Sequence, residues 1–399
     1  MEGFTPIEAN LIWAVLLIAL ISIGYGFWLW RQVQHKAADE IAAAGATLVS
    51  GTQVYLAAGR GMLAVAVLGG AVLMAASALL AAPGAAAVQQ FGSTAEAQTW
   101  VAIGRAGALL IGAGSVLLIA WLGLGASAQA NMALIPAARK GYPQALQVAY
   151  RPGSSSGLLT AGLGLLVSTA IVLVYGAVSV DILLSFALGG VLVAIWLAVS
   201  SGIGASAADT ALFPTDEPGV SGSAGLQHPV TVAGLVQRSA SRVAAVAADL
   251  FGTMEIALVA ALIPGLMLAD IASGATGDGL YAFSFVLFPL VLRAIGIVAT
   301  IIGTLLIRTD ERKRNARAAI NRGLYIGAAL ALVAALGISY IIVRRPDAAV
   351  FDWRPFCAVF TGVVLALLAI KISEYFTSSS AQPVKLVSRF SAHGAPPAS

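Results

Sequence analysis

The feature that most constrains this chain is a series of long apolar stretches that recurs from one end of the sequence to the other. A helix needs about 20 consecutive apolar residues to cross the hydrocarbon core of a bilayer. Nine stretches meet this requirement, at 11–30, 61–82, 100–124, 157–179, 182–204, 243–266, 280–307, 323–343 and 354–373. The sequence therefore predicts an all-α, polytopic integral membrane helix bundle of about nine transmembrane helices.

The composition argues against a soluble protein and for one bundle built as a unit. Hydrophobic residues make up 59% of the chain and charged residues only 10%, which is too little charge to cover a water-exposed surface. The 43 glycines allow helix backbones to approach closely in lipid. We expect a single domain over residues 1–376. The Ser-, Ala- and Pro-containing segment 377–399 is predicted to be a disordered cytoplasmic tail.

Basic residues concentrate in alternate loops. The loops at 31–36, 139–151, 205–242 and 308–322, together with the tail, carry most of the lysines and arginines. Because cytoplasmic loops are enriched in these residues, we expect the N-terminus outside and the C-terminus inside, in a bacterial inner membrane. The first span follows acidic rather than basic residues, which favours a retained helix over a cleaved signal peptide.

The remaining composition excludes several classes of site. The net charge of +4 is accounted for by the basic loops, so we expect the lipid bilayer and not nucleic acid as the partner. The single cysteine, Cys357, cannot form an intramolecular disulfide. The three histidines show no metal-ligand spacing, and no metal site is predicted from them.

Ionisable residues inside the predicted spans are the candidate functional residues, because a charge within a membrane is costly and usually faces protein or water. They are Asp249 and Glu255 on the sixth span, Arg105 on the third and Arg293 on the seventh, with Asp209 just past the end of the fifth. Asp249 and Glu255 are six residues apart, or about 240° around a helix, so they do not share a face.

Two interpretations of these residues stay open. Arg238, Arg242 and Asp249 lie close to one stripe if the sixth helix begins early, which would make a polar track through the bundle. Alternatively the charges form internal ion pairs that hold the bundle together, for example Asp249 with Arg293 or Arg105.

Several local runs, in order along the chain, resemble the membrane-bound pyrophosphatases, which pump protons or sodium at the expense of pyrophosphate. The runs are Gly51-Thr-Gln-Val-Tyr-Leu56, Ala145-Leu-Gln-Val-Ala-Tyr-Arg151, Ala247-Ala-Asp-Leu-Phe-Gly252, Gly296-Ile-Val-Ala-Thr-Ile-Ile-Gly303, Asn321-Arg-Gly-Leu-Tyr325 and Lys371-Ile-Ser-Glu-Tyr-Phe-Thr-Ser378. The resemblance implies a homodimeric pump of about sixteen spans. This chain would correspond to the first nine, and several pyrophosphate ligands and a gate lysine would belong to the other spans.

The resemblance breaks down where the family carries its catalytic residues. At the end of the fifth span Asp209 keeps one family aspartate, whereas Ser206 replaces a lysine, Phe213 a second aspartate and Ala198 an arginine. The three family aspartates that would hold Mg²⁺ at the start of the sixth span align with Gly234, Arg238 and Arg242. Asp249 matches the family's gate aspartate, while Glu255 is out of phase with its gate glutamate.

These substitutions lead to three hypotheses. Arginines repel divalent cations. The first hypothesis is therefore an accessory or structural membrane subunit that is catalytically inactive alone. In such a subunit Arg238 and Arg242 could still bind an anion. The second is that the chain forms part of a pyrophosphate-driven proton or sodium pump, in which case Mg²⁺ is the expected cofactor. The third is an ion-conducting bundle that uses Asp249 as its ion site.

Overall fold

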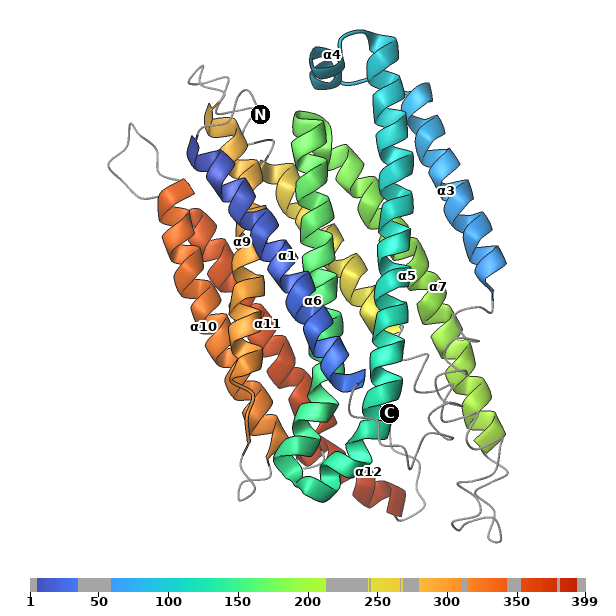
Figure 1. Cartoon of the computed structure of the whole chain (residues 1–399), viewed down its shortest axis with the longest axis vertical. Helices are drawn as coiled ribbons and strands as arrows, with labels where there is room; N and C mark the ends of the chain where they lie inside the picture. Colours follow the sequence, from blue (N-terminus) through green and yellow to red (C-terminus); the bar gives the residue numbers. More distant parts are fainter. Residues whose placement is uncertain are drawn as a thin grey trace. The chain divides into compact units, whose positions relative to one another are not determined.

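The structure is a computed structural model that describes residues 6–34, 59–212, 243, 245–265, 267, 280–309, 315–342, 353–378 and 381–392. It divides into two compact units, Met1–Tyr325 and Ile326–Ser399. Figure 1 traces the helices in sequence order.

Within the described residues, nine helices are long and apolar enough to cross a membrane, and each corresponds to one predicted span. Their bounds are α1 Pro6–Gln34, α3 Arg60–Leu80, α5 Thr94–Lys140, α6 Tyr142–Tyr175, α7 Ser179–Leu212, an unlabelled helix at Ala245–Gly265, α9 Leu280–Leu305, α10 Ala316–Ile342 and α11 Arg354–Thr377. Three short elements complete the description: α4 Ala85–Phe91, η2 Gly176–Val178 and α12 Gln382–Ala392. The prediction of a polytopic all-α membrane bundle is confirmed.

Helix α5 is much longer than the span predicted for it. It has 47 residues, or about 70 Å at the usual helical rise, whereas the hydrocarbon core is only about 30 Å thick. Its start is fixed by a capping box, in which Ser93 Oγ accepts from the Glu96 backbone N–H and Glu96 Oε2 accepts from that of Ser93. It ends at Lys140, and Gly141, whose φ of 141° favours glycine, separates it from the first residue of α6, Tyr142.

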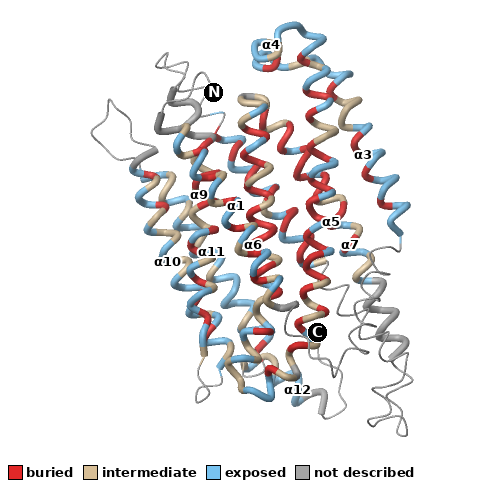
Figure 2. The backbone as a smooth tube through the Cα atoms, in the orientation of Figure 1, coloured by how far each residue is buried: buried red, intermediate tan, exposed pale blue. Residues whose placement is uncertain are grey.

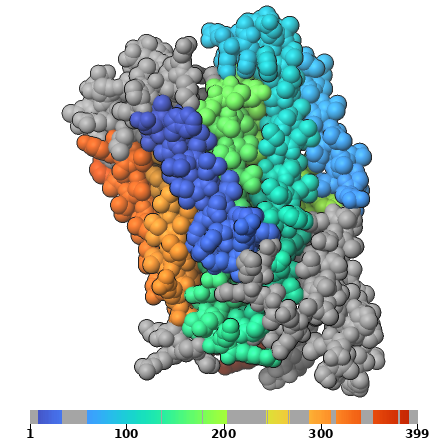
Figure 3. All heavy atoms as spheres, viewed as in Figure 1, coloured from blue at the N-terminus to red at the C-terminus, as the bar shows by residue number. Residues whose placement is uncertain are grey.

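Helices α1 and α6 pack along each other through small residues. Ser22 Oγ of α1 donates to the Leu158 carbonyl at 2.8 Å, and Ser155 Oγ of α6 donates to the Gly26 carbonyl at 2.7 Å. A Cβ atom at Gly26 would meet Leu159 at 3.0 Å. Figure 3 shows α1 on the outside of the bundle, where it packs against α6 and α9. Small residues thus permit the backbone approach that drives helix association in lipid.

Small residues also allow α5 and α7 to pack closely. A Cβ atom at Gly112 would overlap the Phe186 carbonyl, and one at Gly189 would overlap the Leu109 carbonyl. The Phe186 ring then meets that of Phe251 edge-on at 5.5 Å, which connects α7 to the helix Ala245–Gly265. Figure 2 shows buried residues concentrated along α5, α6 and α7, while most of α3 is exposed.

The second unit consists of the rest of α10 with α11 and α12. Helix α11 has no buried residue. Within the segment expected to be a disordered tail, Gln382–Ala392 forms the helix α12. Of the long predicted loop 205–242, the part up to Leu212 continues α7 as helix, and the remainder lies outside the described residues. The single-domain expectation stays a prediction.

Candidate functional site

A buried ion pair joins two membrane-spanning helices of the first unit. Arg293 of α9 donates through Nη2 to Oε1 of Glu255, on the helix Ala245–Gly265, at 2.5 Å. The exposed fractions of the two side chains are 9% and 1%. Ser168 of α6 donates through Oγ to the other carboxylate oxygen, Oε2, at 2.9 Å. Both oxygens of Glu255 therefore have a donor.

The room for this pair comes from a glycine. Gly164 lies one helical turn before Ser168 on α6, and a Cβ atom there would overlap both the Glu255 carboxylate and the Arg293 guanidinium. Any side chain at this position would push into the ion pair. The local sequence of α6 thus supplies both a hydrogen-bond donor and the space in which the two charges meet.

The electrostatics of this cluster are unevenly satisfied. Removing two charges from water is costly, and their attraction offsets that cost only where the remaining hydrogen-bonding groups are also satisfied. The Nε and Nη1 atoms of Arg293 are buried and have no hydrogen-bond partner. Buried donors of this kind are usually satisfied by internal water. The two unpartnered donors of Arg293 therefore offer hydrogen bonds to an internal water between the helices of this cluster.

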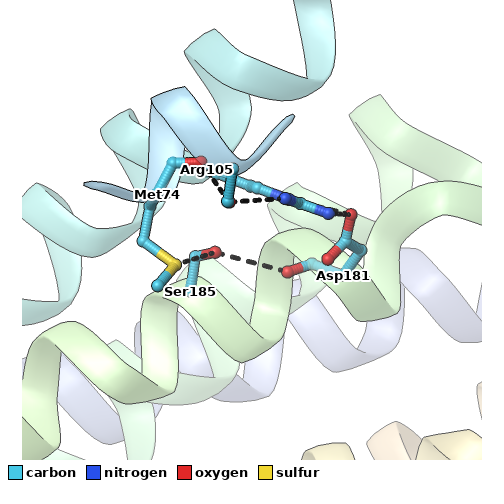
Figure 4. A network of polar contacts seen from close by, with 5 residues as sticks. Met74, Arg105, Asp181 and Ser185 are labelled. Atoms are coloured by element: carbon cyan, nitrogen blue, oxygen red, sulfur yellow. Dashed lines mark hydrogen bonds and ion pairs between the residues drawn. The ribbon is translucent and has the colours of Figure 1, made fainter. Parts of the chain in front are cut away.

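A second charged network joins α3, α5 and α7 (Figure 4). Arg105 donates through Nε and Nη2 to Oδ2 of Asp181, at 3.0 and 2.6 Å, and through Nη1 to Ser77 Oγ at 2.7 Å. Ser185 Oγ lies against Met74 Sδ and the Asp181 carbonyl. The exposed fractions of the Arg105 and Asp181 side chains are 20% and 37%. This pair is therefore partly exposed, in contrast to the buried pair of Arg293 and Glu255.

A cavity of about 470 Å³ lies beside this network. Arg105, Asp181 and Gln98 are its polar lining, and Val259 and Ile263 contribute apolar surface from the helix that carries Glu255. Val259 and Ile263 follow Glu255 by four and eight residues, so they lie near its face of the helix. The cavity therefore begins about one turn beyond the buried pair along the same helix.

The structure separates the two predicted carboxylates of the sixth span. Glu255 is buried and Asp249 is exposed, which confirms that they occupy different faces. Among the described residues, Arg105 pairs with Asp181 and Arg293 with Glu255, so the expectation that either arginine pairs with Asp249 is corrected. The reason is position, because Arg293 lies beside Glu255, whereas Arg105 of α5 lies beside Asp181 in the first turn of α7.

The remaining candidates are only partly visible. Asp209 lies in α7, near its C-terminal end, but its side chain is not among those described. Arg238 and Arg242 lie outside the described residues. Within the described part of the chain, no group of three or more His, Cys, Asp or Glu side chains could hold a metal ion.

The sequence pointed to Arg105, Arg293 and Glu255 as candidate site residues but not to the residues that contact them. Asp181, Ser168 and Gly164 were not identified as site residues. Asp181 carried a usable signal, because it directly precedes the fifth span and Arg105 lies near the start of the third, so both fall at the predicted outer ends of their helices. Ser168 and Gly164 carried none, since small residues occur throughout the chain.

The comparisons with known proteins agree on one family. The family model described as "Inorganic H+ pyrophosphatase" matches residues 20–397. The K(+)-insensitive pyrophosphate-energized proton pump of Chloroflexus aurantiacus is 40% identical over 405 residues, covering 99% of this chain and 51% of the relative. The protein of the same name from Streptomyces avermitilis is 31% identical over 332 residues, covering 73% of this chain and 39% of the relative.

A putative K(+)-stimulated pyrophosphate-energized sodium pump of Bacteroides thetaiotaomicron is more distant, at 25% identity over 412 residues, covering 96% of this chain and 51% of the relative. The chain thus spans about half the length of the curated relatives that it matches over nearly its whole sequence. With its apolar helices and a family match over most of its length, the chain is an integral, multi-pass membrane protein of the inorganic H+ pyrophosphatase family.

Proposed function

We propose that this chain forms part of a pyrophosphate-energised proton pump. The observation that carries the proposal is the 40% identity, over 99% of the chain, to a relative named as such a pump. The proposal is also consistent with ionisable side chains buried inside the membrane-spanning bundle, which are rare outside ion pathways and internal ion pairs.

The carboxylates on the helix Ala245–Gly265 have different parts in this proposal. Glu255 is enclosed by Arg293 and Ser168 and holds three helices in register. Asp249 is exposed on a face that also presents Thr253 and Ile256. A carboxylate left in lipid would be costly, so Asp249 faces protein or water in the assembled pump, where it can take up and release an ion.

An accessory role without catalysis is the second candidate. It rests on the alignment of Arg238 and Arg242 with positions where the family carries Mg²⁺-binding aspartates. Arginine at those positions would repel the cation and could still bind a phosphate oxygen. The naming of the relatives as pumps favours the first candidate over this one.

The test is pyrophosphate-driven proton uptake by the chain and whatever assembles with it. The chain is extracted in mild detergent with its co-purifying proteins, reconstituted into vesicles and supplied with magnesium pyrophosphate, and lumenal acidification and phosphate release are measured. Asp249→Asn is compared with the matched control Thr253→Ala, one turn further along the same exposed face.

Each outcome of this test assigns a role. Proton uptake that is lost in Asp249→Asn and kept in Thr253→Ala supports the pump. Hydrolysis and uptake that do not respond to Asp249→Asn would instead support an accessory role in a larger complex. A monodisperse, folded preparation that neither hydrolyses pyrophosphate nor takes up protons would overturn the proposal.

A further inference from the structure

A pocket separate from both ion-pair networks lies between α1, α6 and the end of α9. Its volume is about 330 Å³. Tyr25, Trp28 and Gln32 line it from α1, Tyr150 and Arg151 from α6, and Arg308 lies just past the end of α9. None of these residues belongs to either ion-pair network.

The charges in this pocket are of one sign. Among the described residues, its lining contains two guanidinium groups, those of Arg151 and Arg308, and no carboxylate. The ion pairs found among the described residues involve neither arginine. Arg151 donates through Nη2 to Gln147 Oε1 at 3.3 Å, which uses only one of its several N–H donors. As far as the described lining residues go, the pocket therefore presents positive charge that no carboxylate balances.

The aromatic residues place this pocket at the edge of the membrane. The last turns of α1 carry Tyr25, Phe27, Trp28 and Trp30 immediately before Arg31. Tyrosine and tryptophan are enriched at the level of the lipid headgroups, and basic residues lie on the cytoplasmic side of that level. The rings of Tyr25 and Trp28 stack at 5.4 Å and form one wall of the pocket.

The pocket has both a polar acceptor and an apolar approach. The Oε1 atom of Gln32 is buried and has no hydrogen-bond partner. On α1, Ile21 and Leu17 precede Tyr25 by one and two turns, and both are strongly exposed, as a lipid-facing stripe would be. A ligand with a phosphate, a hydroxyl group and an apolar tail would match the arginines, the Gln32 acceptor and the apolar stripe, in that order.

We propose that this pocket binds the headgroup of an anionic phospholipid of the phosphatidylglycerol type. The phosphodiester oxygens accept charge-assisted hydrogen bonds from Arg151 and Arg308. A headgroup hydroxyl donates to Gln32 Oε1, and an acyl chain runs along the stripe of Leu17 and Ile21. Basic pockets between helices at the cytoplasmic membrane surface recognise lipids in this way. The volume of the pocket is that of an ordinary small-ligand site.

The test is native mass spectrometry of the purified chain, titrated in detergent with phosphatidylglycerol or with zwitterionic phosphatidylcholine. We expect phosphatidylglycerol to bind at least about fivefold more tightly, and Arg151→Gln or Arg308→Gln each to weaken that binding about fivefold. The control is Lys140→Gln, an exposed base in the last turn of α5 that does not line the pocket. It should leave the affinity unchanged.

Three results would overturn the proposal. Equal binding of the two lipids by the wild-type chain would show that the headgroup charge is not read, and this comparison needs no variant to fold. An equal loss in Lys140→Gln would assign the preference to general surface charge. Displacement of phosphatidylglycerol by millimolar inorganic phosphate would make the pocket a site for free phosphate and not for lipid.

Discussion

Arg293 donates to Glu255 across the interface between two membrane-spanning helices. The two residues are 38 positions apart in the sequence, and both side chains are buried. A pair in this setting is costly to break, because removing one partner leaves an uncompensated charge. The same pair contributes little net stability over a well-packed neutral alternative. Removing one partner should therefore cost more stability than removing both.

Glu255→Gln and Arg293→Met should each destabilise the bundle strongly, by about 3–5 kcal/mol for a fully buried pair. The double variant should be more stable than either single variant, since it buries no unpaired charge while the Met side chain keeps much of the apolar volume of the arginine stem. Thermal unfolding in detergent, followed by fluorescence-detected size exclusion, measures all three. Losses that simply add in the double variant would contradict the pairing.

Gly164→Ala should destabilise the chain by about 1–3 kcal/mol, because the added methyl group overlaps the Glu255 carboxylate and the Arg293 guanidinium. The matched control is Gly157→Ala on the same helix, where a Cβ atom meets nothing within 4 Å. That control should be neutral or slightly stabilising, since alanine favours the helix. Equal melting temperatures for the two variants would show that Gly164 does not provide the space for the pair.

Arg105→Gln and Asp181→Asn should cost far less, about 1 kcal/mol or below, because this pair is partly exposed and solvent screens it. The loss should shrink further as the salt concentration rises, whereas that of Glu255→Gln should not. Melting temperatures at low and high salt test this contrast. A salt-independent loss as large as that of Glu255→Gln would mean that the network is enclosed by lipid or protein.

The spans could be predicted because a bilayer imposes one length and one composition on every helix that crosses it. The opposite placement of Asp249 and Glu255 followed from helical geometry alone. The extra length of α5 did not follow, because its continuation mixes alanines with polar residues such as Ser127 and Gln129, which still form a helix but interrupt the apolar stretch. Hydropathy therefore predicts the part of α5 that crosses the membrane and not the part that extends beyond it.

The ion pairs could not be predicted for a different reason. Choosing Asp181 for Arg105 and Glu255 for Arg293 requires knowing which helices are neighbours, and periodicity does not carry that information. The glycines hold part of it, since Gly112 and Gly189 mark the approach of α5 to α7. In a sequence with 43 glycines, however, nothing distinguishes a glycine that is needed for a helix contact from the others.

The orientation of the bundle in the membrane should follow the distribution of the basic residues, with the N-terminus outside. With Cys357 replaced by serine, single cysteines are introduced at the exposed positions Ala85, on α4, and Lys140, at the end of α5. If the N-terminus is outside, a membrane-impermeant maleimide added to intact cells labels Ala85→Cys but labels Lys140→Cys only after permeabilisation. Because α5 connects the two positions across the membrane, the reverse pattern would invert the whole bundle and move the pocket of Arg151 and Arg308 to the outer leaflet. Labelling of both positions in intact cells would mean that α5 does not separate them across the bilayer.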